Sequence, residues 1–404
     1  MSAQPQPADP LAVRATPAEF LPDDGCTGTL VSRAWVPGAA AGPSVVAIRD
    51  DGVFDLSSAF ATMADLLDAD DPAAQARATP GRRIASLDEL LANSPADDRD
   101  PQRPFLLAPC DLQVVKAAGV TFATSLIERV IEEQARGDAS MAEAARAQVQ
   151  AVVGDDLAAL VPGSPEAMAL KALLQGKGLW SQYLEVGIGP DAEVFTKAPV
   201  LSSVGAGDDI GIRADSHWNN PEPEVVLAVN SRGDIVGAAL GNDVNLRDIE
   251  GRSALLLGKA KDNNASCAIG PFIRLFDTSF GLTEVRSEVL DMRVNGRDGF
   301  ELRGLNSMAR ISRDPVDLVG QTMQAHQYPD GFMLFLGTLF APIEDRDRPG
   351  GGFTHKLGDV VRIRSARLGE LRNRVVLCEQ AAPWRFGLRA LMDNLARRGL
   401  LGRG

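Results

Sequence analysis

The second half of the chain is divided into short segments. From about Trp180 onward, runs of Val, Ile and Leu are broken by Gly, Pro, Asn and Asp at intervals of about eight to twelve residues. This spacing predicts a β-rich region of mostly antiparallel or mixed strands. A chain of 404 residues is long enough for two or three domains and a large core.

Composition changes along the chain predict four parts. They are a flexible N-terminal arm (1–25), a small N-terminal domain (26–104), a helical connection (105–180) and a β-rich domain (181–404). The arm is rich in Pro, Ala and Asp. The N-terminal domain ends in a polar, proline-bounded segment, 93–104, which has the composition of a linker.

Local signals predict individual elements in the N-terminal part. Residues 45–48 and 53–56 read as a hairpin turning at Asp50-Asp51-Gly52. A helix is expected over 58–67, and another after Ser86, where Ser-Leu-Asp-Glu has the spacing of a capping box.

The predicted connection is mainly helical. Residues 122–154 combine Ala, Glu, Arg and Gln with apolar residues at helical spacing, interrupted at Gly137-Asp138. Ser164-Pro165-Glu166 supplies an N-cap, an N1 proline and a first-turn acid for a further helix that ends near Gly176 and Gly178.

Charge and cysteine usage limit the classes of partner. The net charge is −13, from 41 basic and 54 acidic side chains, which argues against nucleic acid and anionic membranes. No apolar run approaches the ~20 residues of a membrane span, and no signal peptide is visible. We expect a cytoplasmic protein with reduced thiols, because the cysteines are far apart in sequence: Cys26, Cys110, Cys267 and Cys378.

Two glutamates open the apolar run PEPEVVLAV. Glu222 and Glu224 are two residues apart, so in a strand they point to the same face and each raises the pKa of the other. Asp243 follows the next strand-like run and could join them. Three carboxylates without His or Cys favour Mg²⁺ or Mn²⁺ over zinc. The alternative is an exposed edge strand with Asp243 capping a turn.

Basic residues follow these carboxylates. Arg247, Lys259 and Lys261 are candidates for anion binding or proton transfer beside the metal, and the alternative is a solvated loop. His217 lies close in sequence to the glutamate pair and is more simply read as a surface residue. We expect His326 and His355 to be structural.

Four segments together resemble the fumarylacetoacetate hydrolase superfamily. They are VVAIRDDGVFDLSSAFATMADLL, VFTKAPVLSSVGAGDDI, PEPEVVLAVNSRGDIVGAALGNDVNLRDIEG and DGFMLFLGTLFAP. The resemblance implies an α+β, β-rich fold, in which a small N-terminal α+β domain precedes a mixed β-sandwich roll. It also implies a homodimer.

The resemblance implies roles for particular residues. Glu222, Glu224 and Asp243 would bind Mg²⁺, which the α-oxo-acid end of a small 2-oxo acid substrate would then chelate. Arg247 falls on the family's substrate-binding arginine. The family's K-x8-GP spacing selects Lys261 as the functional lysine, and Lys259 fits only with a two-residue gap.

One further motif bears on substrate binding. The GT pair of the C-terminal strand is Gly337-Thr338, and Thr338 would hydrogen-bond the carboxylate end of the substrate.

One departure from the family pattern affects the expected reaction. The hydrolases carry a G-x-N-Y-x-x-H segment whose histidine activates water, whereas GVTFATS places Ser125 at that position. A neutral hydroxyl does not accept a proton as imidazole does. The AGVTF segment followed by SLIERVIEE resembles a branch that dehydrates 2-keto-3-deoxy sugar acids.

The sequence therefore predicts a Mg²⁺-dependent dehydratase that converts 2-keto-3-deoxypentonate to 2-oxoglutarate semialdehyde in pentose catabolism. Lys261 and Glu128 are the candidate base and acid, in either order, and Ser125 would position water or substrate. One alternative is a C–C hydrolase of acylpyruvates or 2,4-diketo sugar acids. The other is a 2-oxo-acid-binding protein without catalysis.

Overall fold

The computed structural model describes residues 9–136, 138–143, 160–176, 180–340, 342, 344–349 and 352–402. The strands are β1 (Thr29–Val36), β2 (Gly42–Arg49), β3 (Gly52–Asp55), β4 (Arg82–Ala85), β5 (Phe105–Leu107), β6 (Val114–Gly119), β7 (Glu193–Ala198), β8 (Asp209–Ile212), β9 (Asn219–Asn220), β10 (Pro223–Val229), β11 (Ile235–Asp243), β12 (Asn245–Leu246), β13 (Cys267–Leu275), β14 (Val289–Asn295), β15 (Glu301–Ser307), β16 (Phe332–Phe335), β17 (Val360–Ser365) and β18 (Gly369–Leu377). The α-helices are α1 (Pro17–Phe20), α2 (Met63–Leu67), α3 (Pro72–Ala78), α4 (Leu87–Ala92), α5 (Ala123–Gln134), α7 (Pro165–Gly176), α8 (Gln182–Ile188), α9 (Arg247–Glu250), α10 (Leu257–Lys261), α11 (Leu282–Val285), α12 (Pro315–Met323) and α13 (Leu388–Arg397). Within this part of the chain, none of the helices combines the length and apolarity needed to cross a membrane.

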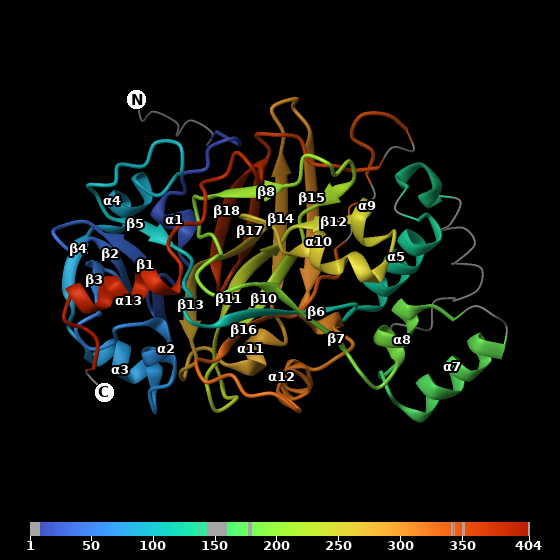
Figure 1. Cartoon of the computed structure of the whole chain (residues 1–404), viewed down its shortest axis with the longest axis horizontal. Coiled ribbons are helices and arrows are strands. Elements are labelled where there is room, and N and C mark those ends of the chain that lie inside the picture. Colours follow the sequence, from blue (N-terminus) through green and yellow to red (C-terminus); the bar gives the residue numbers. More distant parts are fainter. Residues whose placement is uncertain are drawn as a thin grey trace, which may run out of the picture.

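A large mixed sheet runs through the centre of the molecule (Figure 1). Its strand order is β4-β3-β2-β1-β13-β11-β10-β16-β6-β7, with β5 paired to β1. Strand β1 pairs antiparallel with β13, which places Val31 opposite Ile273. Strands from the first hundred residues therefore share one hydrogen-bonded sheet with the β-rich region that follows.

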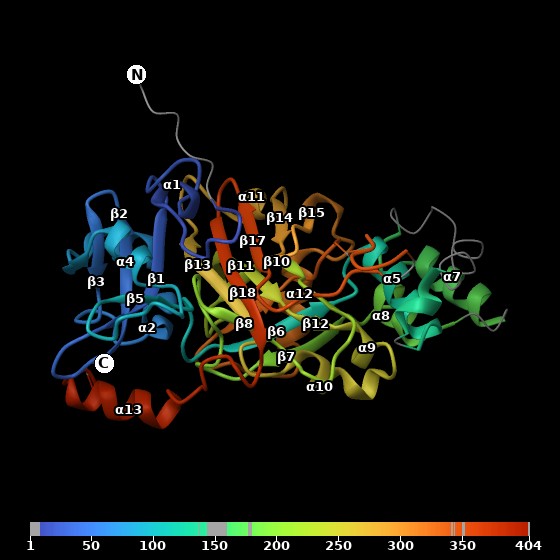
Figure 2. The same ribbon diagram turned by 90° about the horizontal axis from the view of Figure 1, so that it is seen from above.

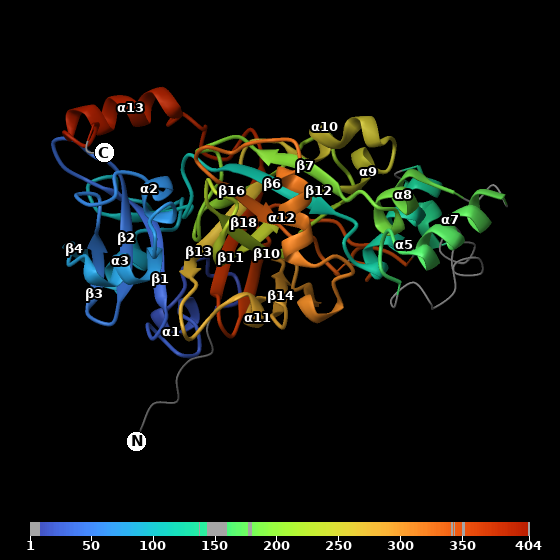
Figure 3. The same ribbon diagram turned by 90° about the horizontal axis from the view of Figure 1, so that it is seen from below.

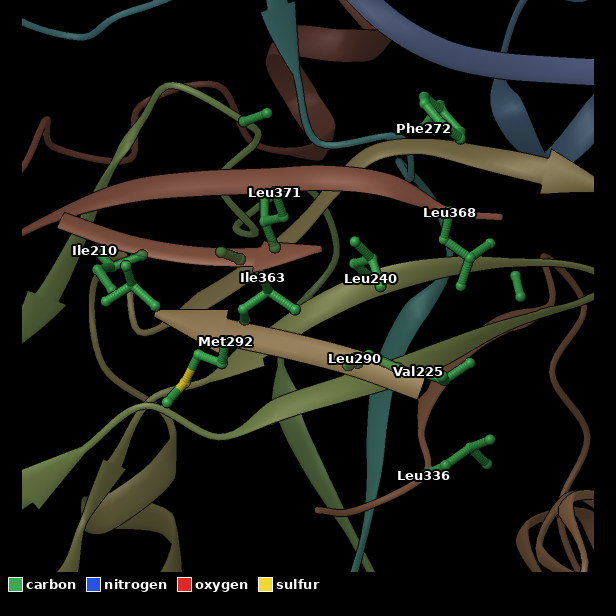
Figure 4. Close-up of a cluster of buried hydrophobic side chains, with 14 of the residues drawn as sticks. Ile210, Val225, Leu240, Phe272, Leu290, Met292, Leu336, Ile363, Leu368 and Leu371 are labelled. Carbon is green, nitrogen blue, oxygen red and sulfur yellow. The ribbon is translucent and has the colours of Figure 1, made fainter. Parts of the chain in front are cut away.

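A second sheet covers the central strands of the first. Its order is β15-β14-β17-β18-β8, and β14 alternates buried and exposed residues, as expected of a strand with one face on a core. Figure 4 shows apolar side chains from both sheets meeting in this interface, including Val225 and Leu240 from the large sheet and Met292, Ile363 and Leu371 from the second. These side chains are almost completely buried. This layered, β-rich α+β architecture is the one expected from the sequence.

Several local predictions are confirmed. Strands β2 and β3 form the expected hairpin, with Arg49 opposite Gly52. Ser86 caps α4 in a reciprocal capping box with Glu89. Ser164 Oγ accepts a hydrogen bond from Ala167 N–H at the start of α7.

Other boundaries differ from the prediction. The helix expected over 58–67 begins at Met63, because Thr62 forms a capping box with Asp65. The segment 93–104 was expected to be a linker but is anchored. Asn93 is buried, and its amide nitrogen donates to the carbonyls of Asp100 and Arg103 at 2.9 and 3.1 Å.

The predicted N-terminal arm is also partly ordered. Within 1–25 the described residues include α1, and Arg364 donates to the Glu19 carbonyl at 2.6 Å. Phe20 at the end of α1 is fully buried against Phe272. The flexible character expected of this segment therefore fails for residues 17–20, because an aromatic side chain anchors them to the core.

The region predicted as a helical connection begins with two strands, β5 and β6, before α5. Strand β6 pairs parallel with β16 and antiparallel with β7, so this region contributes to the large sheet. Helices α5, α7 and α8 form a lobe at one end of the molecule (Figure 2). The expected helical stretch over 144–154 lies outside the described residues.

The opposite end of the molecule carries α13, which lies across the N-terminal strands and helices (Figure 3). Leu391 and Leu395 pack beside Leu112 and Ala61. Asn394 donates to the Ala41 carbonyl at 2.8 Å. The C-terminal helix α13 therefore lies at the opposite end of the molecule from the lobe formed by α5, α7 and α8.

Candidate metal centre and active site

The β10–β11 hairpin brings three carboxylates together. Glu222 immediately precedes β10, Glu224 lies within it, and Asp243 ends β11. Pairing of Pro223 with Asn242 sets the register, so the three side chains reach one point. All three are at most 4 % exposed, and one ligand oxygen from each lies within 4.8 Å of the others. The structure thus brings the predicted ligand residues together.

The carboxylates differ in electrostatic environment. Burial and the charges of Asp243 and Glu222 raise the pKa of Glu224 well above its ordinary value. Glu224 Oε2 accepts a hydrogen bond from the Gly337 N–H at 2.6 Å. For Asp243, burial acts in the raising direction, but the charges of Lys197 and Lys261 outweigh it, and its pKa is lowered.

Among the described residues, three cationic side chains contact the cluster. Lys261 Nζ lies 2.5 Å from Glu222 Oε2 and 3.0 Å from Asp243 Oδ2. Lys197 Nζ lies 2.8 Å from Asp243 Oδ1 and also donates to the Val244 carbonyl. Arg129 from α5 pairs with Glu222 Oε1 at 2.5 Å.

The two candidate lysines have different surroundings. Lys261 is buried, whereas the side chain of Lys259 is 41 % exposed and pairs with Asp215 at 3.1 Å. Of the two, only Lys261 is brought to the carboxylates. Burial acts to lower the pKa of Lys261, but the charges of Asp243 and Glu222 outweigh burial and raise it. This direction of the pKa shift favours a role for Lys261 as a proton or hydrogen-bond donor.

Arg247 is held at the start of α9. Its guanidinium lies over the Trp218 ring at 4.3 Å from the centroid. It donates to the Pro342 carbonyl at 3.1 Å and to Glu128 Oε2 at 3.4 Å. The planar guanidinium is thereby fixed in one orientation beside Glu128.

Ser125 and Thr338 lie at the same site. Ser125 Oγ donates to the Phe122 carbonyl at 2.9 Å, and the Phe122 N–H donates back at 3.3 Å. Its hydroxyl therefore stabilises the first turn of α5. Thr338 Oγ1 accepts from the Phe340 N–H at 3.1 Å. Gly337 has a φ of 86°, and a Cβ there would overlap Thr121, so this position requires glycine.

Two small cavities of about 20 Å³ each adjoin at the carboxylates. The cavity we call the metal cavity is lined by Glu193, Glu222, Glu224, Asp243, Glu250 and Lys261, among others. The cavity we call the distal cavity is lined by Ser125, Glu128, Arg129, Asn220, Glu222, Arg247, Thr338 and Phe340. Ser125, Arg129, Glu222 and Thr338 line both. The two cavities are therefore neighbours separated by these shared side chains.

Glu193 was not singled out by sequence reasoning. It begins β7 opposite Gly119, and a Cβ at residue 119 would overlap its carboxylate. Burial, followed by the charge of Glu250, raises the pKa of Glu193 to about 7, although the nearby Arg129 acts in the other direction. No local sequence pattern marks Glu193, because its environment comes from α5 and α9.

Other site residues were also missed or underrated. Lys197 lies in the F-x-K-x-P segment, where its motif position was a usable signal. Arg129 had the pattern of an ordinary helix-surface residue, yet it bridges Glu222 and Glu250, the latter at 3.0 Å. Its role depends on the packing of α5 against the hairpin, which no local pattern encodes.

The histidines take up other positions. His217 is exposed, and its backbone N–H donates to Asp248 at 2.8 Å. His326 is exposed and stacks on Tyr328. His355 is buried beside Asp359 at 3.2 Å. None of them lines either cavity.

The residues present fit a hard divalent cation. The three converging ligands are carboxylate oxygens, which Mg²⁺ prefers, and no sulfur or imidazole lies among them in the described residues. Burial, followed by the charges of Asp243 and Glu222, raises the pKa of Glu224, and a cation between the carboxylates would stabilise its ionised form.

Comparison with known proteins supports one family. Residues 187–376 match the family described as fumarylacetoacetate (FAA) hydrolase, C-terminal. The chain is 29% identical over 332 residues to a probable 2-keto-3-deoxyxylonate dehydratase of Haloferax volcanii, covering 82% of this chain and 94% of the relative. It is 31% identical over 181 residues to a 2-dehydro-3-deoxy-D-arabinonate dehydratase of Saccharolobus solfataricus, covering 44% of this chain and 57% of the relative.

Solved structures share the fold. A hexagonal crystal form of 2-keto-3-deoxyarabinonate dehydratase aligns with a TM-score of 0.59 at 22% identity, covering 86% of this chain and 98% of that one. The same enzyme name, complexed with magnesium and 2,5-dioxopentanoate, aligns with a TM-score of 0.59 at 21% identity and the same coverage. Residues 187–376 are thus similar to the fumarylacetoacetate hydrolase C-terminal family, and the chain as a whole resembles the 2-keto-3-deoxypentonate dehydratases.

Proposed function

We propose that the protein is a Mg²⁺-dependent hydro-lyase that removes water from a 2-keto-3-deoxypentonate and forms 2-oxoglutarate semialdehyde. The observation that carries this proposal is the chemical composition of the two cavities. Their described lining combines three metal-ligand carboxylates with further ionisable groups, and it contains no imidazole and no thiol. Such a site suits proton transfer next to a 2-oxo acid better than water activation by histidine.

The charges around the site support an anionic ligand bound with a divalent cation. The described cluster consists of Glu222, Glu224, Asp243, Glu250, Lys197, Lys261 and Arg129. With every group ionised and Glu193 left aside, its carboxylates exceed its cations by one charge. Adding Mg²⁺ and a monoanionic 2-oxo acid brings the sum to zero. Charge balance of this kind lowers the cost of burying each ion.

The cavities are smaller than usual ligand pockets, which hold several hundred Å³. Arg129 and Lys261 both contact oxygens of Glu222, between the two cavities. We therefore expect these side chains to move when the metal and a five-carbon acid bind.

Residues of this chain are suited to the proton transfers. When bound, Mg²⁺ would be chelated by the 2-oxo acid end of the substrate and would make the C3 protons more acidic. Glu193, with its pKa of about 7, is placed to accept a C3 proton near neutral pH. Burial acts to lower the pKa of Lys261, but the charges of Asp243 and Glu222 raise it, so the ammonium is suited to donate a hydrogen bond to developing negative charge.

Departure of the C4 hydroxyl requires a proton on the distal side. Glu128 lines the distal cavity and is oriented by Arg247 at 3.4 Å. With a proton on Glu128, its carboxyl can supply that proton, so the hydroxyl leaves as water. Transfer of one proton from C5 to C3 then gives an enol, transfer of the O5–H proton to C4 gives the semialdehyde, and the reaction balances as the loss of one water.

The test is incubation with a 2-keto-3-deoxypentonate, Mg²⁺ and D₂O, followed by mass spectrometry and NMR. We expect a five-carbon aldehyde acid lighter than the substrate by one water, with deuterium at C3, and no product in excess chelator. Release of pyruvate from a 2,4-diketo acid, without dehydration of the 3-deoxy acid, would identify a hydrolase instead. Absence of turnover of either compound would favour a binding protein.

A further inference from the structure

Asn220 is a buried residue of the distal cavity to which no role has been assigned. It lies in β9, directly before the Pro221-Glu222 pair, and is 2 % exposed. Its neighbours along the cavity wall include Glu128, Arg247 and Thr338. The side chain therefore lies beside the residues expected to contact substrate.

The amide of Asn220 presents an acceptor to this cavity. Its Nδ2 donates to the Pro221 carbonyl at 2.9 Å, which fixes the orientation of the amide. Its Oδ1 is buried and, among the described residues, accepts no hydrogen bond. Buried polar atoms are normally paired, so an unpaired one in a ligand cavity requires a partner from the ligand or from water.

The position of Asn220 selects one end of the substrate. Asn220 lines the distal cavity but not the metal cavity, which holds Glu224, Asp243 and Lys261. A 2-oxo acid whose C1 and C2 oxygens lie at the carboxylates therefore extends C4 and C5 toward Asn220. This step rests on the proposed function.

The chemistry of elimination distinguishes the two hydroxyls. The C4 hydroxyl must gain a proton to leave, and an acceptor such as Asn220 Oδ1 cannot supply one. The C5 hydroxyl remains through the elimination and has a proton to donate. In the product C5 is an aldehyde, whose oxygen can only accept.

We propose that Asn220 Oδ1 accepts a hydrogen bond from the C5 hydroxyl of the substrate. This bond makes Asn220 a specificity-determining residue that favours acids with a terminal hydroxyl. It also disfavours the aldehyde product, because two acceptors would face each other, and so it promotes product release.

Binding of unreactive ligands tests the proposal directly. 5-Hydroxy-2-oxopentanoate and 2-oxopentanoate both lack the C4 hydroxyl that leaves, and they differ only at C5. With saturating Mg²⁺, we expect the wild-type protein to bind the hydroxy acid about tenfold more tightly, as measured by calorimetry or competition with substrate. Equal affinities would overturn the inference.

Variants assign the preference to one side chain. Asn220→Leu should bind both acids equally while keeping the affinity for 2-oxopentanoate, which also reports that the site is folded. If this variant does not fold, Asn220→Ala serves the same comparison. Asn220→Asp keeps an acceptor oxygen and should retain the preference. Retention of the preference in Asn220→Leu or Asn220→Ala would contradict the assignment.

A matched control lies on the adjacent strand. Asn245 is the cross-strand partner of Asn220 and is fully buried, but it is not among the residues lining the distal cavity. Asn245→Leu should therefore leave the C5 preference unchanged. Failure of the wild-type protein to bind either acid in a Mg²⁺-dependent way would contradict the proposed function itself, whereas Mg²⁺-dependent binding without preference would contradict only the role of Asn220.

Discussion

Lys261 Nζ lies 2.5 Å from Glu222 Oε2, although 39 residues separate them along the chain. This contact joins the last residue of α10 to the residue that precedes β10. It places a buried lysine against a carboxylate that is also a candidate metal ligand. The candidate metal centre and the candidate proton-transfer groups thus form one cluster of interacting charges. We expect substitutions of different members of this cluster to change the stability of the protein in opposite directions.

The metal ligands provide the first prediction. Glu222→Gln, Glu224→Gln and Asp243→Asn should each abolish activity and the thermal stabilisation by Mg²⁺, which grows with free metal as RT ln(1 + [L]/Kd). Thermal unfolding with added Mg²⁺ and with chelator measures this. Full activity in excess chelator would refute the metal assignment.

In the metal-free protein, two of these variants should shift the unfolding temperature in opposite directions. The pKa of Glu224 is raised, so its ionised form destabilises the fold at neutral pH, and Glu224→Gln should increase the unfolding temperature. The pKa of Asp243 is lowered, so its ionised form stabilises the fold, and Asp243→Asn should decrease it. Shifts of the same sign would show that the two carboxylates share one environment.

The lysines provide a matched comparison. Lys261→Met should lower kcat by roughly 10²–10⁴-fold, because it removes a charged donor at the reacting centre. Lys259→Met removes the same charge from an exposed ion pair with Asp215 and should change kcat by less than about tenfold. Steady-state kinetics at saturating Mg²⁺ measures both. A larger loss of kcat in Lys259→Met than in Lys261→Met would identify Lys259, on the exposed side of α10, as the functional lysine.

Glu193 should make stability depend on pH. The ordinary pKa of a glutamate is 4.5, and that of Glu193 in the folded, metal-free protein is about 7. Between these pH values the folded protein holds a proton on Glu193 that the unfolded chain has released. The free energy of unfolding contributed by Glu193 is therefore lost as pH rises through this window, by at most about 1.4 kcal/mol per pH unit.

Glu193→Gln should lack this dependence. The difference in unfolding free energy between wild type and variant should fall from about pH 5 to about pH 7 and then level off, as measured by denaturant titration in chelator. Parallel curves for the two proteins would show that the carboxyl of Glu193 is not perturbed.

Ser125 should matter more for stability than for rate. Its hydroxyl bonds both backbone groups of Phe122, so Ser125→Ala should cost about 1 kcal/mol of unfolding free energy and change kcat only a few fold. Ser86→Ala, at the cap of α4, is a control with a similar loss and no change in kcat. A loss of activity by Ser125→Ala as large as that of Lys261→Met would assign Ser125 a direct catalytic role.

Local patterns in the sequence determine much of the site's framework. Side chains alternate between the two faces of a strand, so the two-residue spacing of Glu222 and Glu224 places both on one face. Glycine and capping signals predict the turn of the β2–β3 hairpin and the start of α4. These features depend on neighbours a few residues apart, so the printed sequence contains them. The ligand triad and Lys261 follow from such patterns together with the family motifs.

Tertiary packing alone decides the rest. Glu193, Arg129 and Asn220 reach the site because α5, β7 and β9 converge there, although nothing in their local sequence marks them. Similarly, the direction of the Lys261 pKa depends on whether desolvation or the charges of Asp243 and Glu222 prevail. Burial and charge separation are properties of the folded chain, because they depend on which distant residues meet. The sequence by itself indicated the three candidate ligands and their strand, and only the folded structure decided which groups surround them and how burial and charge shift the pKa values of those groups.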